Sequence, residues 1–401
     1  MLTNEEKRVK IYTETKPTNP SEVNSDTPLE NLNLNWREKD LPERIRTKHV
    51  HRLHPYLGKY IPQLVEIFLR KFFKPGQTVL DPFVGSGTML VQSNELGINS
   101  IGFDISIFNV ILCKAKTTKY DLEKAKKEIL DILEKVNKKP ELQPQQLALW
   151  EKQGSYHSDY LKTWFASQSL EELLAYRSLI EKEGYEYKDL LKIILSRSAR
   201  SARLTTHFDL DFPKKPQIEP YWCYKHSREC SPTQDAIKFL NRYSHDTIKR
   251  IEEFSKLRSD AWVKVEHADS RNAELPPLDG VITSPPYVGL IDYHEQHAYA
   301  YQLLGLEDNS QKEIGSATNG ASQRSKQQYV EDISAVFRNA MKAMPSGGRL
   351  IVVAADRANL YDQIAEKSGV ETEAVLNRHV NRRTGRRSSE FYESIFIWRK
   401  P

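Results

Sequence analysis

Residues 281–287 read Val-Ile-Thr-Ser-Pro-Pro-Tyr, and the last four could hold a flat group that carries an amine. Pro285 and Pro286 fix two φ angles and remove two backbone donors, so the carbonyl groups beside them are rigidly placed. The Ser284 hydroxyl and the Pro285 carbonyl can both accept hydrogen atoms from an NH2 group. Tyr287 can stack on an attached ring, which is worth about 1–3 kcal/mol for a nucleobase.

An exocyclic base amine is such a group, and these residue types suit its chemistry. Its nitrogen gives its lone pair to the ring and is a poor nucleophile. If Ser284 and Pro285 accept both hydrogen atoms, the nitrogen can pyramidalise and aim its lone pair outward, with no covalent intermediate on the protein. The alternative interpretation is a proline-rich turn after a strand. A second motif disfavours it.

That second motif is Asp81-Pro82-Phe83-Val84-Gly85-Ser86-Gly87-Thr88. It follows a buried-strand pattern at 77–80 and precedes a helical pattern at 89–93. A glycine turn between a strand and a helix can bind a nucleotide-like ligand at the helix N-terminus. A second strand pattern ends in Asp104, an acid placed to accept ribose hydroxyls. The segment therefore predicts a nucleotide-like cofactor.

Three ligands compete for this turn. A phosphate-binding P-loop requires a lysine after the last glycine, and none follows Gly87. A dinucleotide loop requires a third glycine where Leu90 stands. S-adenosylmethionine carries no phosphate, so neither requirement applies to it, and Asp81 can face its ammonium group. S-adenosyl-L-methionine is the predicted cofactor.

Together the two motifs resemble the amino-methyltransferases of DNA, which make N4-methylcytosine or N6-methyladenine. The resemblance implies an α/β, Rossmann-like class I methyltransferase fold with a seven-stranded, mostly parallel sheet. It implies catalytic roles for Ser284, Pro285, Pro286 and Tyr287. It implies cofactor contacts by Asp81, Phe83, Gly85, Ser86, Gly87, Thr88, Asp104, by Pro55 of a His-Pro segment at the methionine end, and by Asp269 near the adenine.

The resemblance covers about residues 50–110 and 262–401, with the cofactor motif first. The acid expected at the third strand is Asp269, so an insertion falls after the second strand. We expect a polar extension at 1–45 that is poorly ordered in part, a cofactor-binding half at 46–115, a largely helical insertion at 116–261 as the candidate target-recognition region, and a catalytic half at 262–401.

Basic residues cluster near the C-terminus. Strand patterns at 373–376 and 394–398 predict a hairpin whose loop is rich in arginine. Such a loop suits DNA phosphates. The candidate contacts are Arg378, Arg382, Arg383, Arg386 and Arg387. A second candidate surface is formed by Arg197, Arg200 and Arg203.

Cys223-x-x-His226-x-x-x-Cys230 places three possible zinc ligands at tight spacing. A structural zinc site takes four ligands. His207, Asp209 or Cys113 could complete it only through folding. The sequence therefore favours no metal here.

Composition agrees with a cytoplasmic DNA enzyme. The 401 residues carry a net charge of +5, and 28% of them are charged. No apolar run reaches the length of a membrane span, and the N-terminus has no signal-peptide pattern. Three cysteines argue against a disulfide framework. Double-stranded DNA is the expected partner, with a cognate restriction endonuclease as a candidate second one.

The resulting expectation is a DNA methyltransferase that acts on a flipped base. Serine at position 284 favours cytosine N4, and adenine N6 is the first alternative. C5 methylation requires a cysteine nucleophile, and no cysteine lies near either motif in the sequence. A methyltransferase of structured RNA is a second alternative, although that class usually has an appended RNA-binding domain. A catalytically silent DNA-binding subunit is a third, although it should have lost one of the motifs.

Overall fold

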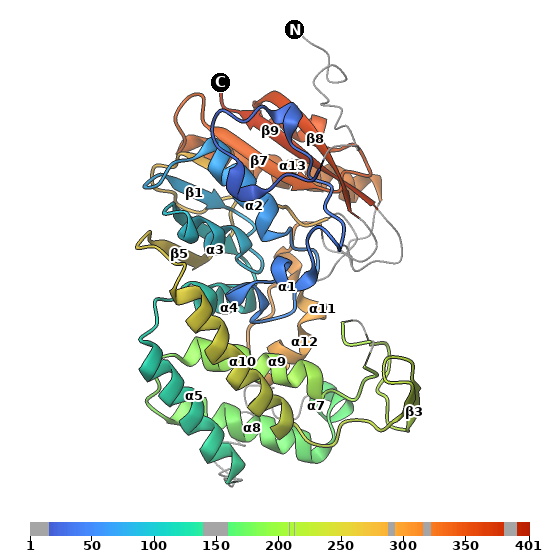
Figure 1. The fold of residues 1–401 in the computed structure, drawn as a ribbon. Helices are drawn as coiled ribbons and strands as arrows, with labels where there is room; N and C mark the ends of the chain where they lie inside the picture. The colour runs from blue at the N-terminus through green and yellow to red at the C-terminus, as the bar shows by residue number, and fades with distance from the viewer. Residues whose placement is uncertain are drawn as a thin grey trace.

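The protein is seen here as a computed structural model, which describes residues 16–138, 159–207, 209–211, 213–287, 293–315, 322–380 and 391–401. Within these ranges the main sheet has seven strands in the order β5-β2-β1-β6-β7-β9-β8 (Figure 1). The first five run parallel, and β9 is antiparallel to β7 and β8. The strands are β1 (Thr78–Asp81), β2 (Asn99–Asp104), β5 (Val263–His267), β6 (Gly280–Thr283), β7 (Arg349–Ala354), β8 (Glu371–Val380) and β9 (Phe391–Arg399). The predicted α/β fold is confirmed.

Helices cover both faces of this sheet. On one face, α2 (Pro62–Phe72) and α3 (Thr88–Glu95) share an apolar core with the strands. On the other, α13 (Gln323–Lys342) and α14 (Tyr361–Ser368) share a second core. Proline at the first position of α2 and the Ser322 side chain before α13 suit helix starts, because the first turn has unsatisfied amides.

The described part of the N-terminal extension is folded onto the sheet edge. The Trp36 indole donates to the Thr18 carbonyl at 3.1 Å, and Leu32 and Leu34 are fully buried. The Asn35 side chain accepts from the His379 amide of β8 at 2.6 Å. Trp36 is itself buried and anchors this segment, and residues 1–15 lie outside the described ranges. The short elements here are η1 (Pro20–Glu22), η2 (Leu29–Asn31), α1 (Glu43–Arg46) and η3 (His49–Arg52).

The chain between β2 and β5 forms a separate layer of helices with its own core (Figure 1). Its described helices are α4 (Ile107–Thr117), α5 (Leu122–Asn137), α7 (Asp159–Trp164), α8 (Ser167–Lys182), α9 (Lys188–Ala202) and α10 (Ile237–Ser255). A two-stranded hairpin, β3 (Tyr221–Cys223) and β4 (Arg228–Cys230), lies between α9 and α10.

Three further short elements follow β6. They are α11 (Tyr293–Gln296), α12 (Ala298–Leu304) and η4 (Ser310–Lys312). Tyr299 and Leu303 of α12 are buried in the core of the helical layer. The segment after β6 therefore joins the two layers.

The arginines in α9 and directly after it do not form the predicted phosphate-binding surface. Arg197 is buried and its guanidinium donates to Asp246 at 2.6 Å. Arg200 pairs with Asp211, and Arg203 lies over the Tyr299 ring at 4.5 Å. These charges hold the helical layer together, so the expectation for this segment was wrong.

The C-terminal hairpin is confirmed by the antiparallel pairing of β8 with β9. Arg378, however, is only 2% exposed, and its guanidinium donates to Glu393 at 2.9 Å and lies 5.6 Å from the Trp36 ring. Its predicted phosphate contact is corrected to an internal ion pair. Arg382, Arg383, Arg386 and Arg387 lie outside the described residues. Among those described, no helix has the length and apolar character needed to cross a membrane.

Candidate active site

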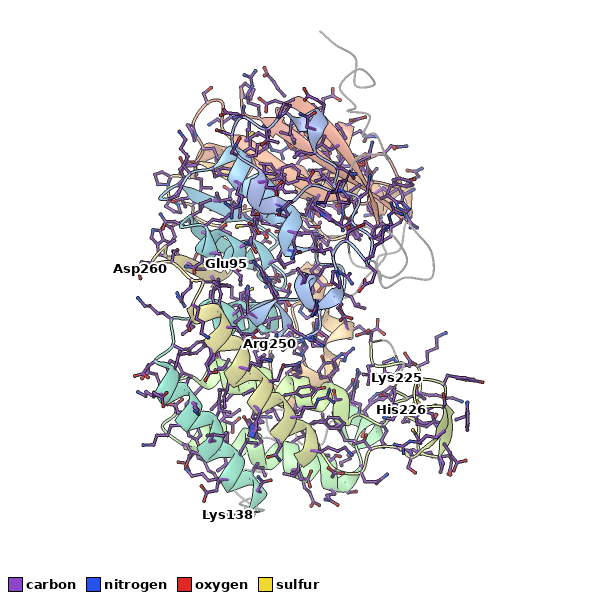
Figure 2. The ribbon with its side chains drawn as sticks, in the orientation of Figure 1. Glu95, Lys138, Lys225, His226, Arg250 and Asp260 are labelled. Carbon is purple, nitrogen blue, oxygen red and sulfur yellow. The ribbon has the colours of Figure 1, made fainter. Side chains whose placement is uncertain are left out.

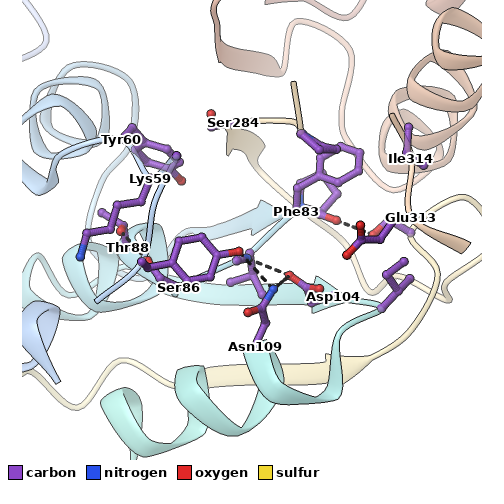
Figure 3. Close-up of a pocket in the computed structure, with 18 of the residues that line it drawn as sticks. Lys59, Tyr60, Phe83, Ser86, Thr88, Asp104, Asn109, Ser284, Glu313 and Ile314 are labelled. Atoms are coloured by element: carbon purple, nitrogen blue, oxygen red, sulfur yellow. Dashed lines mark hydrogen bonds between the residues drawn. The ribbon is translucent and has the colours of Figure 1, made fainter. Parts of the chain in front are cut away.

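A cavity opens where the parallel strands end. In parallel sheets ligands bind beyond the carboxyl ends of the strands, where neighbouring loops diverge. Here those loops follow β1, β2, β5 and β6, and the segment before α2 closes one side (Figure 3). The lining residues include Tyr56, Gly58, Lys59, Tyr60, Pro82, Phe83, Val84, Gly85, Ser86, Thr88, Asp104, Ile105, Asn109, Asp269, Ser270, Ser284, Pro286, Lys312, Glu313 and Ile314.

The two glycines of the turn after β1 are required by its geometry. Gly85 and Gly87 have φ of +47° and +76°, in the left-handed region. A Cβ on Gly87 would lie 2.9 Å from the Cys113 Sγ, and one on Gly85 would lie 3.2 Å from the Tyr56 hydroxyl. Neither position can take a side chain without strain. The backbone can therefore approach a ligand closely.

Two side chains of α4 support this turn from behind. The buried Lys116 ammonium donates to the Ser86 carbonyl at 2.5 Å, and burial lowers the pKa of Lys116 to about 8. The Cys113 thiol lies 3.3 Å from the Gly85 carbonyl. Cys113 is thus close to the cofactor motif in space, unlike in sequence. Burial raises the pKa of this thiol far above its usual range, so it cannot serve as a nucleophile at neutral pH.

Asp104 ends β2 and faces the cavity. Its carboxylate accepts from the Gly85 amide at 2.9 Å, the Asn109 side chain at 3.1 Å and the Ser106 amide at 2.8 Å. Burial raises the pKa of Asp104 to about 6, although these hydrogen bonds oppose the shift. A carboxylate has about four acceptor positions, so this one retains capacity for a ligand hydroxyl.

Asp81 is fully buried and does not line the cavity. It accepts from the Tyr60 hydroxyl at 2.8 Å, the Thr283 hydroxyl at 2.6 Å and the Phe83 amide at 3.1 Å. Burial raises its pKa to about 6 against these hydrogen bonds. Asp81 therefore links the glycine turn to β6, the strand that ends just before Ser284, instead of facing the cavity as predicted.

Asp269 lies two residues beyond β5 and lines the cavity. The Arg271 guanidinium donates to both of its oxygens, the closest contact being 2.6 Å, and also donates to Asp332. Burial alone would raise the pKa of Asp269, but the hydrogen bonds from Arg271 hold it below its usual range. Asp269 is therefore ionised at neutral pH.

The Ser-Pro-Pro-Tyr segment borders two cavities. Ser284 and Pro286 line the first, and Tyr287 lines a second together with Tyr329, Tyr361, Asp356 and Arg357. The Pro286 carbonyl accepts from the Tyr329 hydroxyl at 2.9 Å. Within the described residues, neither the Ser284 hydroxyl nor the Pro285 carbonyl has a hydrogen-bond partner. Both can therefore accept hydrogen atoms from a ligand.

Tyr287 is held in place by the C-terminal hairpin. Its side chain is 6% exposed, and its hydroxyl donates to Glu393 at 3.3 Å. The same carboxylate pairs with Arg378. The orientation of this ring therefore depends on strands that lie about a hundred residues further along the chain.

Pro55 lies beside the first cavity without lining it. It borders a neighbouring cavity with Arg46 and Arg52, while Tyr56, Lys59 and Tyr60 reach the first one. The His-Pro segment therefore contributes through the residues that follow it. The sequence analysis assigned a cofactor contact to Pro55 alone in this segment, and it missed Tyr60, Asn109 and Glu313, because these residues belong to no recognisable motif.

Similarity to known proteins identifies the family. A family model described as DNA methylase matches residues 3–114. The type II methyltransferase M.MjaII of Methanocaldococcus jannaschii is 39% identical over 430 aligned residues, which cover 89% of this chain and 81% of that protein. The chain belongs to the N6/N4 family of DNA methyltransferases.

Two further type II methyltransferases are more distant relatives. M.BsoBI of Geobacillus stearothermophilus is 25% identical over 297 residues, covering 68% of this methyltransferase and 56% of the relative. M.MvaI of Kocuria varians is 23% identical over 289 residues, which cover 67% of this chain and 60% of that protein. The aligned part thus extends well beyond the two motifs of this DNA methyltransferase.

Proposed function

We propose that the protein transfers a methyl group from S-adenosylmethionine to the exocyclic amine of a flipped base in double-stranded DNA, with cytosine N4 as the favoured target. The observation that carries the proposal is the position of the Ser-Pro-Pro-Tyr segment between two cavities. One cavity has the glycine turn and the acids that suit a phosphate-free nucleoside. The other has the tyrosine that suits a base.

The first cavity fits S-adenosylmethionine by the chemistry of its lining. Gly85 and Gly87 allow close backbone approach, and Asp104 has acceptor capacity for ribose hydroxyls. Asp269 would lie near the adenine, with Phe83, Ser86 and Thr88 completing the contacts. When bound there, the cofactor supplies a methyl group on a positively charged sulfur. Asp81 is assigned a positioning role, because its carboxylate is already bonded to Tyr60 and Thr283.

Ser284 and Pro285 would then act on the target amine. The Ser284 hydroxyl and the Pro285 carbonyl accept its two hydrogen atoms, so that the nitrogen lone pair points at the methyl carbon. Methyl transfer would form the N–C bond and break the C–S bond of the cofactor, and the amine would lose one proton to solvent. Tyr287 stacks on the base, and Pro286 keeps the segment rigid through its bond to Tyr329.

Contacts with DNA are assigned to the basic loop and to the insertion. Arg382, Arg383, Arg386 and Arg387 fall between β8 and β9, next to the strands that hold Tyr287. We propose that they contact phosphates. The insertion at 116–261 is the proposed target-recognition region, between the cofactor-binding part at 46–115 and the catalytic part at 262–401. A cognate restriction endonuclease is the proposed functional partner, as expected for a type II system.

The deciding experiment is digestion of methylated DNA to nucleosides. The protein is incubated with S-adenosylmethionine and mixed-sequence duplex DNA, and the nucleosides are identified by mass spectrometry. N4-methylcytosine is expected. N6-methyladenine would retain the mechanism and show that Ser284 does not select the base. The absence of any methylated base in the DNA would contradict the proposal and favour the RNA enzyme or the silent subunit.

A further inference from the structure

The hairpin β3–β4 contributes no residue to any of the three apolar cores. Figure 1 shows it beside the helical layer, and Figure 2 places Lys225 and His226 in this projecting lobe. Its strands have three residues each, and Trp222 and Tyr224 are 54% and 81% exposed. An isolated two-stranded hairpin is marginally stable at best in water. Apolar burial therefore does not explain how this one is held.

Four possible metal ligands converge inside the hairpin. His207, Cys223, His226 and Cys230 each offer one ligand atom, and these four atoms lie within 4.8 Å of one another. Both cysteines are buried, although their neighbours in the hairpin are exposed, and neither forms a disulfide. His207 supplies the fourth ligand, in addition to the three that the hairpin itself provides. It comes from the segment after α9.

The distances match tetrahedral zinc. The Cys223 Sγ lies 3.5 Å from the Nδ1 atoms of both His207 and His226, and the Cys230 Sγ lies 3.5 Å from the Nδ1 of His226. Bond lengths of about 2.3 Å to sulfur and about 2.0–2.1 Å to nitrogen at the tetrahedral angle separate the two ligand atoms by about 3.5 Å. Three of the six ligand–ligand distances are therefore already those that a bound ion requires, and the other three are at most 4.8 Å.

Hydrogen bonding alone accounts for this arrangement less well. The His226 Nδ1 is equidistant from two sulfurs, and a single N–H cannot serve both. The Tyr221 hydroxyl lies 2.9 Å from the His207 Nδ1 and accepts from the His207 amide at 3.0 Å. When a metal binds the His207 Nδ1, the Tyr221 hydroxyl proton can point away from it. The Tyr221 hydroxyl still accepts from the His207 amide.

We propose that His207, Cys223, His226 and Cys230 bind one structural Zn²⁺ ion that holds the hairpin β3–β4 to the segment after α9. Two thiolates and two imidazoles suit zinc among the common divalent cations. With four protein ligands the site is closed, so its role is structural. Two thiolates balance the charge of the ion.

Metal content of the full-length, reduced protein tests the proposal directly. Elemental analysis is expected to find about one zinc ion per chain, and the Cys223→Ser and His226→Gln variants are expected to lose it. Cys113→Ala and His245→Gln are matched controls that remove a cysteine and an exposed histidine elsewhere, and they should retain the ion. Substitution of Co²⁺ should give thiolate-to-cobalt charge-transfer absorption in the wild-type protein and the two controls, and not in Cys223→Ser.

Limited proteolysis keeps the test independent of variants that fail to fold. A chelator should expose the chain between 207 and 230 to cleavage while circular dichroism of the remainder is unchanged, and added Zn²⁺ should restore protection. A protein without zinc after reduction and reconstitution, zinc retained by Cys223→Ser, or a Cys223–Cys230 disulfide in the purified wild-type protein would overturn the proposal.

Discussion

At the residue scale, two acids with similar pKa values have different surroundings. Burial raises the pKa of both Asp81 and Asp104 to about 6. Asp81 is enclosed by protein donors, whereas Asp104 lines the first cavity. Ser284 also lines the first cavity, whereas Tyr287 lines the second. Position relative to the cavities therefore decides which role each side chain can take.

Replacing Ser284 with alanine should impair methyl transfer and leave cofactor binding intact. The variant loses one acceptor for the target amine, and a hydrogen bond to a group gaining charge is worth about 1.5–3 kcal/mol, or about a 10- to 150-fold loss of kcat. Single-turnover rates and calorimetric titration with the cofactor measure the two quantities. A large loss of cofactor affinity would contradict the assigned role.

Cofactor affinity should depend on the ionisation of Asp104. Because its pKa is raised to about 6, the carboxylate is protonated below that pH and loses acceptor capacity. The affinity for S-adenosylmethionine is therefore expected to fall as the pH is lowered from 7 to 5. Asp104→Asn should bind about 5- to 150-fold more weakly at pH 7, for a loss of about 1–3 kcal/mol. Calorimetric titration across this range provides the measurement.

The same pKa has a consequence for stability. An acid whose pKa is raised on folding stabilises the folded state fully below its unfolded pKa, and this contribution is lost as the pH rises through about 6. Asp104→Asn should therefore show a shallower decrease in unfolding free energy between pH 4 and 6 than the wild-type protein. Urea unfolding at each pH gives this free energy. If it decreased with pH equally steeply in both proteins, the raised pKa of Asp104 would be excluded. Asp81 retains its own contribution in both proteins.

At the element scale, the turn between β1 and α3 is shaped by α4 as much as by its own sequence. Gly87 begins α3 in the left-handed region, and the Lys116 ammonium binds the carbonyl before it. The conformation of the turn thus depends on its own glycines and on the contact with α4. Binding of a ligand that contacts the turn would depend on both of these features.

Gly87→Ala should destabilise the protein more than Gly347→Ala. Both glycines have φ near +77°, where a non-glycine residue costs about 1–2 kcal/mol. Only the Cβ at position 87 meets a neighbour, the Cys113 Sγ at 2.9 Å, whereas nothing lies within 4 Å at position 347. Urea unfolding measures the difference, and Cys113→Ala should reduce it. Equal losses for the two variants would remove the steric argument.

At the scale of the whole molecule, segments from near the two ends of the chain are linked to Tyr287 through Arg378 and Glu393. Glu393 of β9 contacts both Tyr287 and Arg378, and Arg378 lies over Trp36 of the N-terminal segment. The described part of this segment is thus a component of the core. The same contacts connect it to the Ser-Pro-Pro-Tyr segment.

Removing either partner of the Arg378–Glu393 pair should be costly. Arg378→Met leaves a buried, unpaired carboxylate, and such losses are about 3–5 kcal/mol. Arg378→Met combined with Glu393→Leu should recover part of this stability, because no charge then remains unpaired. Denaturant unfolding measures both variants. A loss below about 1 kcal/mol for the single variant would show that the pair is solvated.

The loop arginines should affect DNA binding and not folding. Replacing Arg382, Arg383, Arg386 and Arg387 with glutamine should reduce the slope of log affinity against log salt by about 0.9 for each phosphate that these side chains neutralise. Binding to duplex DNA at several salt concentrations provides the slope, with unfolding free energy as the control. An unchanged slope would exclude phosphate contacts by this loop.

The sequence by itself determined the features that depend on neighbouring residues. The strand–glycine turn–helix unit, the Ser-Pro-Pro-Tyr strand end and the C-terminal hairpin are specified by local φ angles and apolar periodicity, and the resemblance placed them in one sheet. The resemblance also located Asp269, the acid after β5, despite the long insertion before that strand.

Only the tertiary structure decided which side chains meet across long separations. It buried Arg378 against Glu393, placed Cys113 behind the glycine turn and brought His207 to Cys223, His226 and Cys230. It also divided the Ser-Pro-Pro-Tyr segment between two cavities. An arginine or histidine has the same local pattern in an exposed loop and in a buried pair, because its partner is chosen by the packing of distant elements.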